Sequence, residues 1–193
     1  MPWPRGLCYD RGMAKALHQP PGRMTVDEFL AWLDEGPEGM RYELVAGEPV
    51  AMAPERAAHA RRKARIWRAL SDAIDRAGLP CEALPDGMTI KVDEHTAYEP
   101  DAIVHCEEAL PDEAVIVVEV LSPTTRARDA GAKLADYFRL PSVRHYLLVQ
   151  TERRTVIHHR RGEEGDIHTR IVTAGSLQLD PPGVTLDLDQ IYG

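Results

Sequence analysis

A glutamate inside an apolar segment is the residue with the clearest chemical potential in this sequence. Glu119 lies in AVIVVEVLSP, where both faces of an extended chain would be apolar. Such a strand is typical of the centre of a sheet. A buried carboxylate there requires a cation, hydrogen-bond donors or a raised pKa. The alternative is a strand end that emerges into solvent, with Glu119 pointing out of the sheet.

A second carboxylate can come next to the first. Asp101 follows Pro100 and opens the apolar segment 102–104, and a loop within 105–114 would return the chain toward Glu119. Two carboxylates on adjacent strands, completed by a main-chain carbonyl and water, suit Mg²⁺ or Mn²⁺ better than zinc. Because Pro-Asp is also common in turns, Asp101 is a candidate only together with a buried Glu119.

These residues resemble a nuclease superfamily. Pro100-Asp101, the strand with Glu119 and a following helix are similar to the PD-(D/E)XK nucleases, and EVLSPTT-x₃-D-x₃-K-x₃-Y is similar to their Uma-type branch of restriction endonucleases. The resemblance covers most of residues 24–192. It implies a restriction-endonuclease-like fold, hydrolysis of phosphodiester bonds in nucleic acid, and Mg²⁺ or Mn²⁺ held by Asp101 and Glu119.

The lysine of the superfamily's E-x-K pattern is replaced by Leu121. In the Uma-type branch this lysine comes from the following helix, so the resemblance assigns its role to Lys133. Lys133 borders the apolar stripe of that helix, from which its amine can reach the strand ends. It could instead form a surface pair with Asp129, worth about 0.3 kcal/mol.

Two further residues belong to the resemblance. Glu43, in the segment RYELV, would join the carboxylates as a metal ligand or as the neighbour of one. It could equally be the solvent-facing residue of an edge strand. His59 would donate to a phosphate or a carboxylate, whereas a histidine at the start of a helix can also cap or pack.

Basic side chains gather on the helix that begins near His59. Residues 56–76 contain seven Lys and Arg against two Asp, in a chain whose net charge is −8. Such a cluster can follow nucleic-acid phosphates, and we expect Arg61, Arg65 and Arg68 to bind substrate together with His59. A solvated helix face would show the same pattern.

Both helices and strands are needed to position these residues. Thr25 and Glu28 have capping-box spacing before a short helix, and two extended segments joined at Ala46-Gly47 predict an N-terminal β-hairpin. Helical spacing predicts helices over 60–77 and 126–139. Further strands are predicted at 89–92, 102–105, 114–121, 144–150, 155–159 and 167–173. Strands 114–121 and 144–150 enclose a helix and should be parallel, so we expect an α/β fold with a central mixed β-sheet flanked by helices.

Length and composition predict one folded domain. Of 193 residues, 44% are hydrophobic and 28% charged, which excludes a disordered or coiled-coil chain. Residues 1–23 show no periodic pattern and predict a mobile basic tail before a single domain over residues 24–193. The net charge of −8 excludes a generally basic surface, so any nucleic-acid site must be local.

Cysteine usage and hydropathy indicate a compartment. Cys8, Cys81 and Cys106 contain no C-x-x-C pair, so we expect neither a disulfide framework nor a thiolate zinc site. No apolar run is long enough to span a membrane, and no signal peptide is visible. We therefore expect a soluble cytoplasmic protein.

The residues and the family resemblance together imply a metal-dependent endonuclease, which we expect to act on DNA as a homodimer. Asp101, Glu119, Lys133 and Glu43 would form its centre, with Mg²⁺ or Mn²⁺ as the cofactor. The alternative is a catalytically inert dimeric interaction or DNA-binding module on the same fold. The missing E-x-K lysine and the acidic chain favour that alternative.

Overall fold

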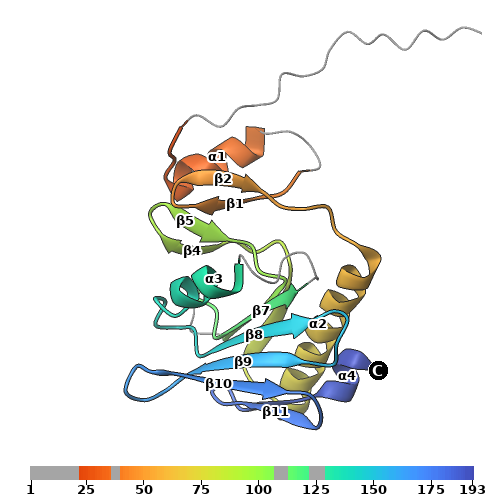
Figure 1. The fold of residues 1–193 in the computed structure, drawn as a ribbon. Coiled ribbons are helices and arrows are strands. Elements are labelled where there is room, and N and C mark those ends of the chain that lie inside the picture. The colour runs from red at the N-terminus through yellow and green to blue at the C-terminus, as the bar shows by residue number, and fades with distance from the viewer. Residues whose placement is uncertain (1–21, 36–39, 107–112, 122–128) are drawn as a thin grey trace, which may run out of the picture.

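Two larger β-sheets, a separate two-stranded sheet and one long helix form the framework of the described part of the protein (Figure 1). The computed structural model describes residues 22–35, 40–106, 113–121 and 129–193, without the side chains of residues 129 and 130. Of the two larger sheets, the smaller has four strands, all within residues 42–98, and the larger has six. The elements below are those that position the candidate site.

The larger sheet contains the predicted parallel pair. Its strands are β3 (Cys81–Pro85), β6 (Ala102–Cys106), β7 (Ile116–Leu121), β8 (His145–Gln150), β9 (Val156–Arg161) and β10 (Ile167–Val172). Their order is β10-β9-β8-β7-β6-β3. The β7–β8 pair is parallel, and the other neighbouring strands of this sheet are antiparallel. The expected central mixed sheet is confirmed.

The smaller sheet contains the predicted hairpin. Its strands are β1 (Tyr42–Val45), β2 (Glu48–Ala51), β4 (Ile90–Asp93) and β5 (Thr96–Tyr98), in the order β2-β1-β5-β4. Ala46 and Gly47 connect β1 to β2 with φ angles of 51° and 86°. Positive φ at both turn residues matches the right-handed twist of the two strands. This sheet brings Glu43 of β1 toward the larger one.

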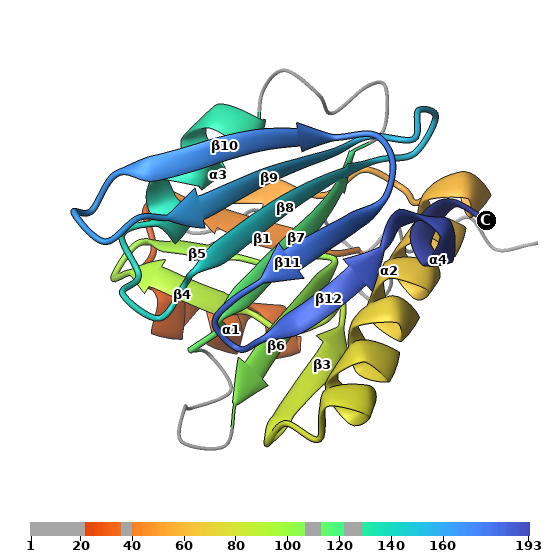
Figure 2. The same cartoon turned by 90° about the horizontal axis from the view of Figure 1, so that it is seen from below.

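Helix α2 (Ala57–Ala77) packs lengthwise against one face of the larger sheet. Ile66, Leu70 and Ile74 form its buried stripe, and each such side chain contributes about 1.5–3 kcal/mol when it leaves water. The helix ends at Gly78, whose φ of 62° is left-handed. The same layer contains the hairpin of β11 (Ser176–Leu179) and β12 (Val184–Asp187), followed by α4 (Leu188–Tyr192) (Figure 2).

Helix α3 (Asp129–Tyr137) covers the opposite face of the larger sheet. Tyr137 is fully buried, and its ring packs at 5.6 Å from the ring of Tyr98 and at 5.1 Å from that of Tyr146. These aromatic contacts hold α3 above β7 and β8. They thereby fix the position of Lys133, one turn earlier on the helix.

Helix α1 (Val26–Glu35) packs against the smaller sheet through Phe29 and Trp32. Its start has the predicted capping box: the Glu28 main-chain N–H donates to Thr25 Oγ1 at 3.2 Å, and the Thr25 main-chain N–H donates to Glu28 Oε2 at 2.8 Å. The capping-box prediction is confirmed.

Several elements differ from the predictions. The first residues of the predicted helix 126–139 lie outside the described residues. Of the predicted tail, the structure describes only Gly22 and Arg23. The short strands β3, β5, β11 and β12 and the helix α4 were not predicted. Among the described residues, no helix is long and apolar enough to cross a membrane.

The expectation of no disulfide was wrong. Cys81 and Cys106 form a disulfide across the β3–β6 pair, where they stand directly opposite each other. Their separation of 25 residues in the chain gave no sign of this pairing. Only the strand register brings them together, and β3 was not among the predicted strands.

Candidate metal and catalytic site

The candidate site lies where β7 extends beyond the start of β6. Val118 already pairs with Ala102, the first residue of β6, so Val120 has no strand neighbour on that side. Side chains take the place of the missing strand. The Val120 N–H donates to Asp101 Oδ2 at 2.6 Å, and its carbonyl oxygen accepts a hydrogen bond from His59 Nε2 at 2.6 Å.

Asp101 and Glu119 occupy neighbouring positions across this strand end. Continuing the β6–β7 register by one residue sets Asp101 opposite Glu119. The Asp101 carboxylate lies at the strand edge toward His59 and Lys63 of α2, whereas the Glu119 carboxylate contacts Lys133 of α3. Asp101 is 6% exposed and the Glu119 side chain 14%. Burial raises the pKa of Asp101 despite the Val120 hydrogen bond, and burial with the nearby Asp101 charge raises the pKa of Glu119 despite Lys133.

Lys133 joins Glu119 to Glu43. Its Nζ donates to Glu119 Oε1 at 2.9 Å and to Glu43 Oε1 at 2.7 Å. Glu119 Oε1 also accepts a hydrogen bond from the Tyr137 hydroxyl at 3.1 Å, and Glu43 Oε1 accepts one from the Glu99 main-chain N–H at 3.1 Å. At 7% exposed, Lys133 is buried, so a surface pair does not describe it.

Burial and neighbouring charges shift the pKa values of Lys133 and Glu43 in opposite directions. Burial alone would lower the pKa of Lys133, but the charges and hydrogen bonds of Glu119 and Glu43 raise it above its ordinary value. Burial raises the pKa of Glu43, which Lys133 opposes and Glu119 reinforces. The Lys133 ammonium is therefore paired with both Glu119 and Glu43, two carboxylates that repel each other.

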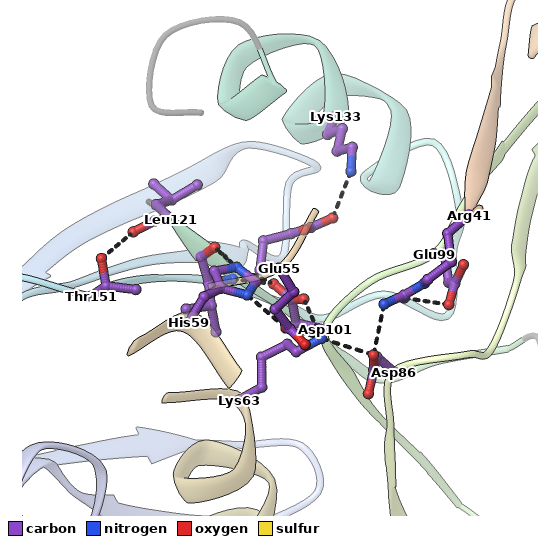
Figure 3. A network of polar contacts seen from close by, with 12 residues as sticks. Arg41, Glu55, His59, Lys63, Asp86, Glu99, Asp101, Leu121, Lys133 and Thr151 are labelled. Carbon is purple, nitrogen blue, oxygen red and sulfur yellow. Dashed lines mark hydrogen bonds and ion pairs between the residues drawn. The ribbon is translucent and has the colours of Figure 1, made fainter. Parts of the chain in front are cut away.

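A second polar group lies on the α2 side of Asp101 (Figure 3). Glu55 Oε1 lies 2.9 Å from His59 Nδ1 and 2.5 Å from Lys63 Nζ. His59 Nε2 and Lys63 Nζ each lie 3.6 Å from an Asp101 oxygen. Both ring nitrogens of His59 face oxygen acceptors, so the ring donates through both only when it carries both protons.

The network continues outward through Asp86 and Arg41. Asp86 Oδ2 accepts hydrogen bonds from Lys63 Nζ at 2.8 Å and from Arg41 at 2.9 Å, and Arg41 also donates to Glu99. The Arg41 side chain is 39% exposed, so the network reaches the surface at this end. A cavity of about 260 Å³ opens beside it and is lined by Glu55, Ala60, Lys63, Ala64, Trp67, Pro85, Asp86 and Asp101.

The structure brings together five of the residues proposed from the sequence. Asp101, Glu119, Lys133, Glu43 and His59 meet at this strand end, although they come from five different elements or their edges. The structure does not bring the proposed arginines there.

Arg61, Arg65 and Arg68 lie on the exposed side of α2. The 100° step between helix residues sets Arg61 and Arg68 on the other side of the helix from Lys63. The Arg65 guanidinium donates to the main-chain oxygen of Gly193, next to α4. At least one of the three therefore has a structural partner.

Sequence reasoning missed Lys63, Glu55, Asp86 and Tyr137. Lys63 stands in a basic run, where a solvated side chain is the ordinary expectation. A signal was present, because Lys63 follows His59 by four residues and so lies on the same helix face. Tyr137 is the last residue of the motif EVLSPTT-x₃-D-x₃-K-x₃-Y, but its hydroxyl contact with Glu119 could not be read from spacing.

The donor atoms at the strand end fit a hard divalent cation. The carboxylates of Asp101 and Glu119 and the carbonyl of Val120 are oxygen donors of the kind that Mg²⁺ and Mn²⁺ prefer. Within the described ranges, no three His, Cys, Asp or Glu side chains have metal-binding geometry, so an ion would take only two side-chain ligands here. Across the network, six carboxylates face three permanent cations, which leaves a formal charge of −3 when all are ionised.

Comparison with known proteins identifies the family. The family model described as "Uma2: Putative restriction endonuclease" matches residues 26–189, which include every residue of the candidate site. The chain belongs to the Uma2 family. The resemblance stated from EVLSPTT-x₃-D-x₃-K-x₃-Y is therefore confirmed.

Two relatives extend the comparison. The Uma2 chain is 26% identical over 178 residues to "Uncharacterized protein slr1290" of Synechocystis sp., which covers 88% of this chain and 92% of that protein. A crystal structure of a putative nuclease belonging to DUF820 from Anabaena variabilis has the same fold, with a TM-score of 0.70 at 14% identity. The match covers 88% of this chain and 97% of that one. The restriction-endonuclease-like fold is thereby shown.

Proposed function

We propose that this Uma2 protein is a metal-dependent endonuclease that hydrolyses phosphodiester bonds in DNA. Asp101 and Glu119 would hold one Mg²⁺ or Mn²⁺ ion, together with the Val120 carbonyl. The observation that carries the proposal is the buried carboxylate of Asp101 next to the largely buried carboxylate of Glu119 at the β7 strand end, beside a buried lysine. Buried acidic groups with shifted pKa values around a lysine are characteristic of catalytic sites.

Each residue around the carboxylates has a proposed part in the chemistry. The metal ion would polarise the scissile phosphate and lower the pKa of a bound water molecule. The Lys133 ammonium would orient that water or stabilise charge that develops in the transition state. Glu43 holds this ammonium in place, since it accepts one of its hydrogen bonds. His59 would donate to the substrate phosphate from its position beside Asp101.

The proposal also covers substrate contacts, the oligomeric state and the cellular location. We assign nucleic-acid phosphate contacts to the exposed Arg61 and Arg68, while Arg65 would have to release Gly193 in order to join them. The proposed assembly is a homodimer, because two centres are needed to cut both strands of a duplex at once. The proposed location is the cytoplasm, where the substrate DNA lies, and the Cys81–Cys106 disulfide does not support it.

Plasmid nicking tests the proposed function. With Mg²⁺ or Mn²⁺ the full chain should convert supercoiled plasmid to the nicked form, and chelation should stop the reaction. Glu119→Gln and Asp101→Asn should each abolish nicking, because each removes a proposed metal ligand without changing side-chain size. Lys91→Met is the control, since Lys91 is exposed and lies 3.7 Å from Asp27 in a surface pair, away from the candidate site.

The same experiment separates the two functions predicted from the sequence. If the wild type shows no metal-dependent nicking while it binds DNA or dimerises, the inert interaction module is the correct function. Retained nicking in Glu119→Gln would show that the reaction occurs at another site.

A further inference from the structure

Lys63 is a buried cation surrounded by carboxylates from three separate segments. Its Nζ lies 2.5 Å from Glu55 Oε1, 2.8 Å from Asp86 Oδ2 and 3.6 Å from Asp101 Oδ1. The three carboxylates precede α2, follow β3 and precede β6, so only the tertiary fold assembles them. At 7% exposed, Lys63 differs from Arg61, Arg65 and Arg68, which are exposed on the same helix.

The ammonium contacts the same Asp101 that is proposed to bind metal, but through the other oxygen. Asp101 Oδ2 accepts the hydrogen bond of the Val120 N–H, whereas Oδ1 faces Lys63. Lys63, Glu55, Asp86 and Asp101 all line the cavity of about 260 Å³, which gives access to this side of Asp101. Asp101 is therefore held between the strand end and a fixed positive charge.

The charge on Lys63 is secure in this environment. Burial alone would lower the pKa of Lys63, but its hydrogen bonds to Asp86 and Glu55 and the charge of Asp101 outweigh burial and raise it. A lysine ammonium is a compact point charge, closer to a metal ion in shape than the forked guanidinium of arginine.

We propose that the Lys63 ammonium takes the place of a second divalent cation at this centre, so that the protein works with a single metal ion. In two-metal enzymes the ions lie about 3.5–4 Å apart and together neutralise the charge of the reacting phosphate. Here Asp101 lies between one ion site and an ammonium that three carboxylates hold in place. Lys63 is a positioning residue, since it acts through Asp101. This inference rests on the proposed metal-dependent function of the same carboxylates.

Counting bound Mn²⁺ ions tests the inference. The full-length wild type should bind one Mn²⁺ per chain in a titration followed by electron paramagnetic resonance and calorimetry. Lys63→Met removes the charge and keeps the apolar stem, which leaves Glu55, Asp86 and Asp101 without their cation. This variant should bind two Mn²⁺ per chain. Its nicking rate should become sigmoidal in Mn²⁺ concentration, whereas the wild-type dependence is hyperbolic.

A second Lys63 variant and a control variant complete the experiment. Lys63→Gln should behave like Lys63→Met, and Lys91→Met should keep one Mn²⁺ and a hyperbolic dependence. If the Lys63 variants unfold without metal, Mn²⁺ should refold them with two ions bound. Variants that stay unfolded in Mn²⁺ overturn the inference.

The possible outcomes separate this inference from the proposed function. One Mn²⁺ in both the wild type and the Lys63 variants, or two in the wild type, overturns the role of Lys63 and leaves the metal-dependent function standing. No Mn²⁺ in the wild type overturns the proposed function itself, and the inference with it.

Discussion

The two carboxylates that accept hydrogen bonds from Lys133 lie at different sequence separations from it. Glu119 precedes it by 14 residues and Glu43 by 90. The nearer partner was predictable, because a helix after a central strand returns across the strand end. Glu43 was assigned only through the family resemblance, since nothing local in β1 reports where its side chain points.

Lys63 shows where reasoning from single residues fails. Its neighbours Arg61, Arg62 and Arg65 form a basic run, and a run of like charges predicts a solvated face. Tertiary packing buries Lys63, which shares a helix face with His59, whereas Arg61 and Arg65 stay exposed. Of the carboxylates that surround Lys63, Asp101 was proposed from the sequence, but no sequence pattern gave the positions of Glu55 and Asp86.

At the residue scale we predict that Lys133→Met lowers the nicking rate by at least about a hundredfold, or roughly 3 kcal/mol in the barrier. The variant also leaves Glu43 and Glu119 buried without their cation, so the metal-free protein should lose about 3–5 kcal/mol of stability. Added Mn²⁺ should recover part of this loss. Single-turnover nicking and urea unfolding measure the two effects.

Lys91→Met is again the control for Lys133→Met, and it should change stability by less than about 1 kcal/mol. An unchanged nicking rate in Lys133→Met would remove the lysine from the proposed chemistry.

At the scale of elements, local patterns were the reliable ones. The capping box of α1, the Ala46-Gly47 turn and the parallel β7–α3–β8 unit each occupy one continuous segment, and each was predicted correctly. The strand β5 has three residues and β11 and β12 have four each, which is too short for an alternating pattern to stand out. β11 and β12 pair with each other, and β5 pairs with its neighbour β4 and with the more distant β1.

The β8–β9 pair contains a buried element that responds to acid. His145 Nδ1 lies 2.9 Å from His158 Nε2, and His145 Nε2 lies 2.9 Å from the Pro181 carbonyl oxygen. Burial lowers the pKa of His145 to about 4, and burial with the neighbouring His145 lowers that of His158 to about 3. The folded protein therefore keeps both rings neutral at a pH where the unfolded chain protonates them.

We predict that the free energy of unfolding falls as the pH drops from about 6.5 to about 4. Because the unfolded state binds more protons in this range, acid favours unfolding, by roughly 3 kcal/mol for each histidine at pH 4. His158→Gln should remove about half of this dependence, whereas the exposed His168→Gln should leave it intact. Urea unfolding at several pH values measures the slope, and equal slopes in wild type and His158→Gln would refute the assignment.

At the scale of the whole molecule, the site exists only where the two sheets meet. Glu43 comes from β1 of the smaller sheet, Glu119 from β7 of the larger one, and Lys133 and His59 from helices on opposite faces of that larger sheet. The sequence predicted the strands of the larger sheet except β3, but it did not predict that β1 and β2 join β4 and β5 in a sheet of their own. The convergence of these residues is a property of the fold, which no segment contains alone.

The central claim is that Asp101 and Glu119 bind one divalent cation at the end of β7, and diffraction from a crystal soaked in Mn²⁺ tests it most directly. We predict one anomalous peak between the two carboxylates, roughly 2.0–2.4 Å from an oxygen of each and close to the Val120 carbonyl. The His59 ring should then have left that carbonyl. A crystal with no peak at this position, in which Lys133 and His59 keep their present contacts, would contradict the account.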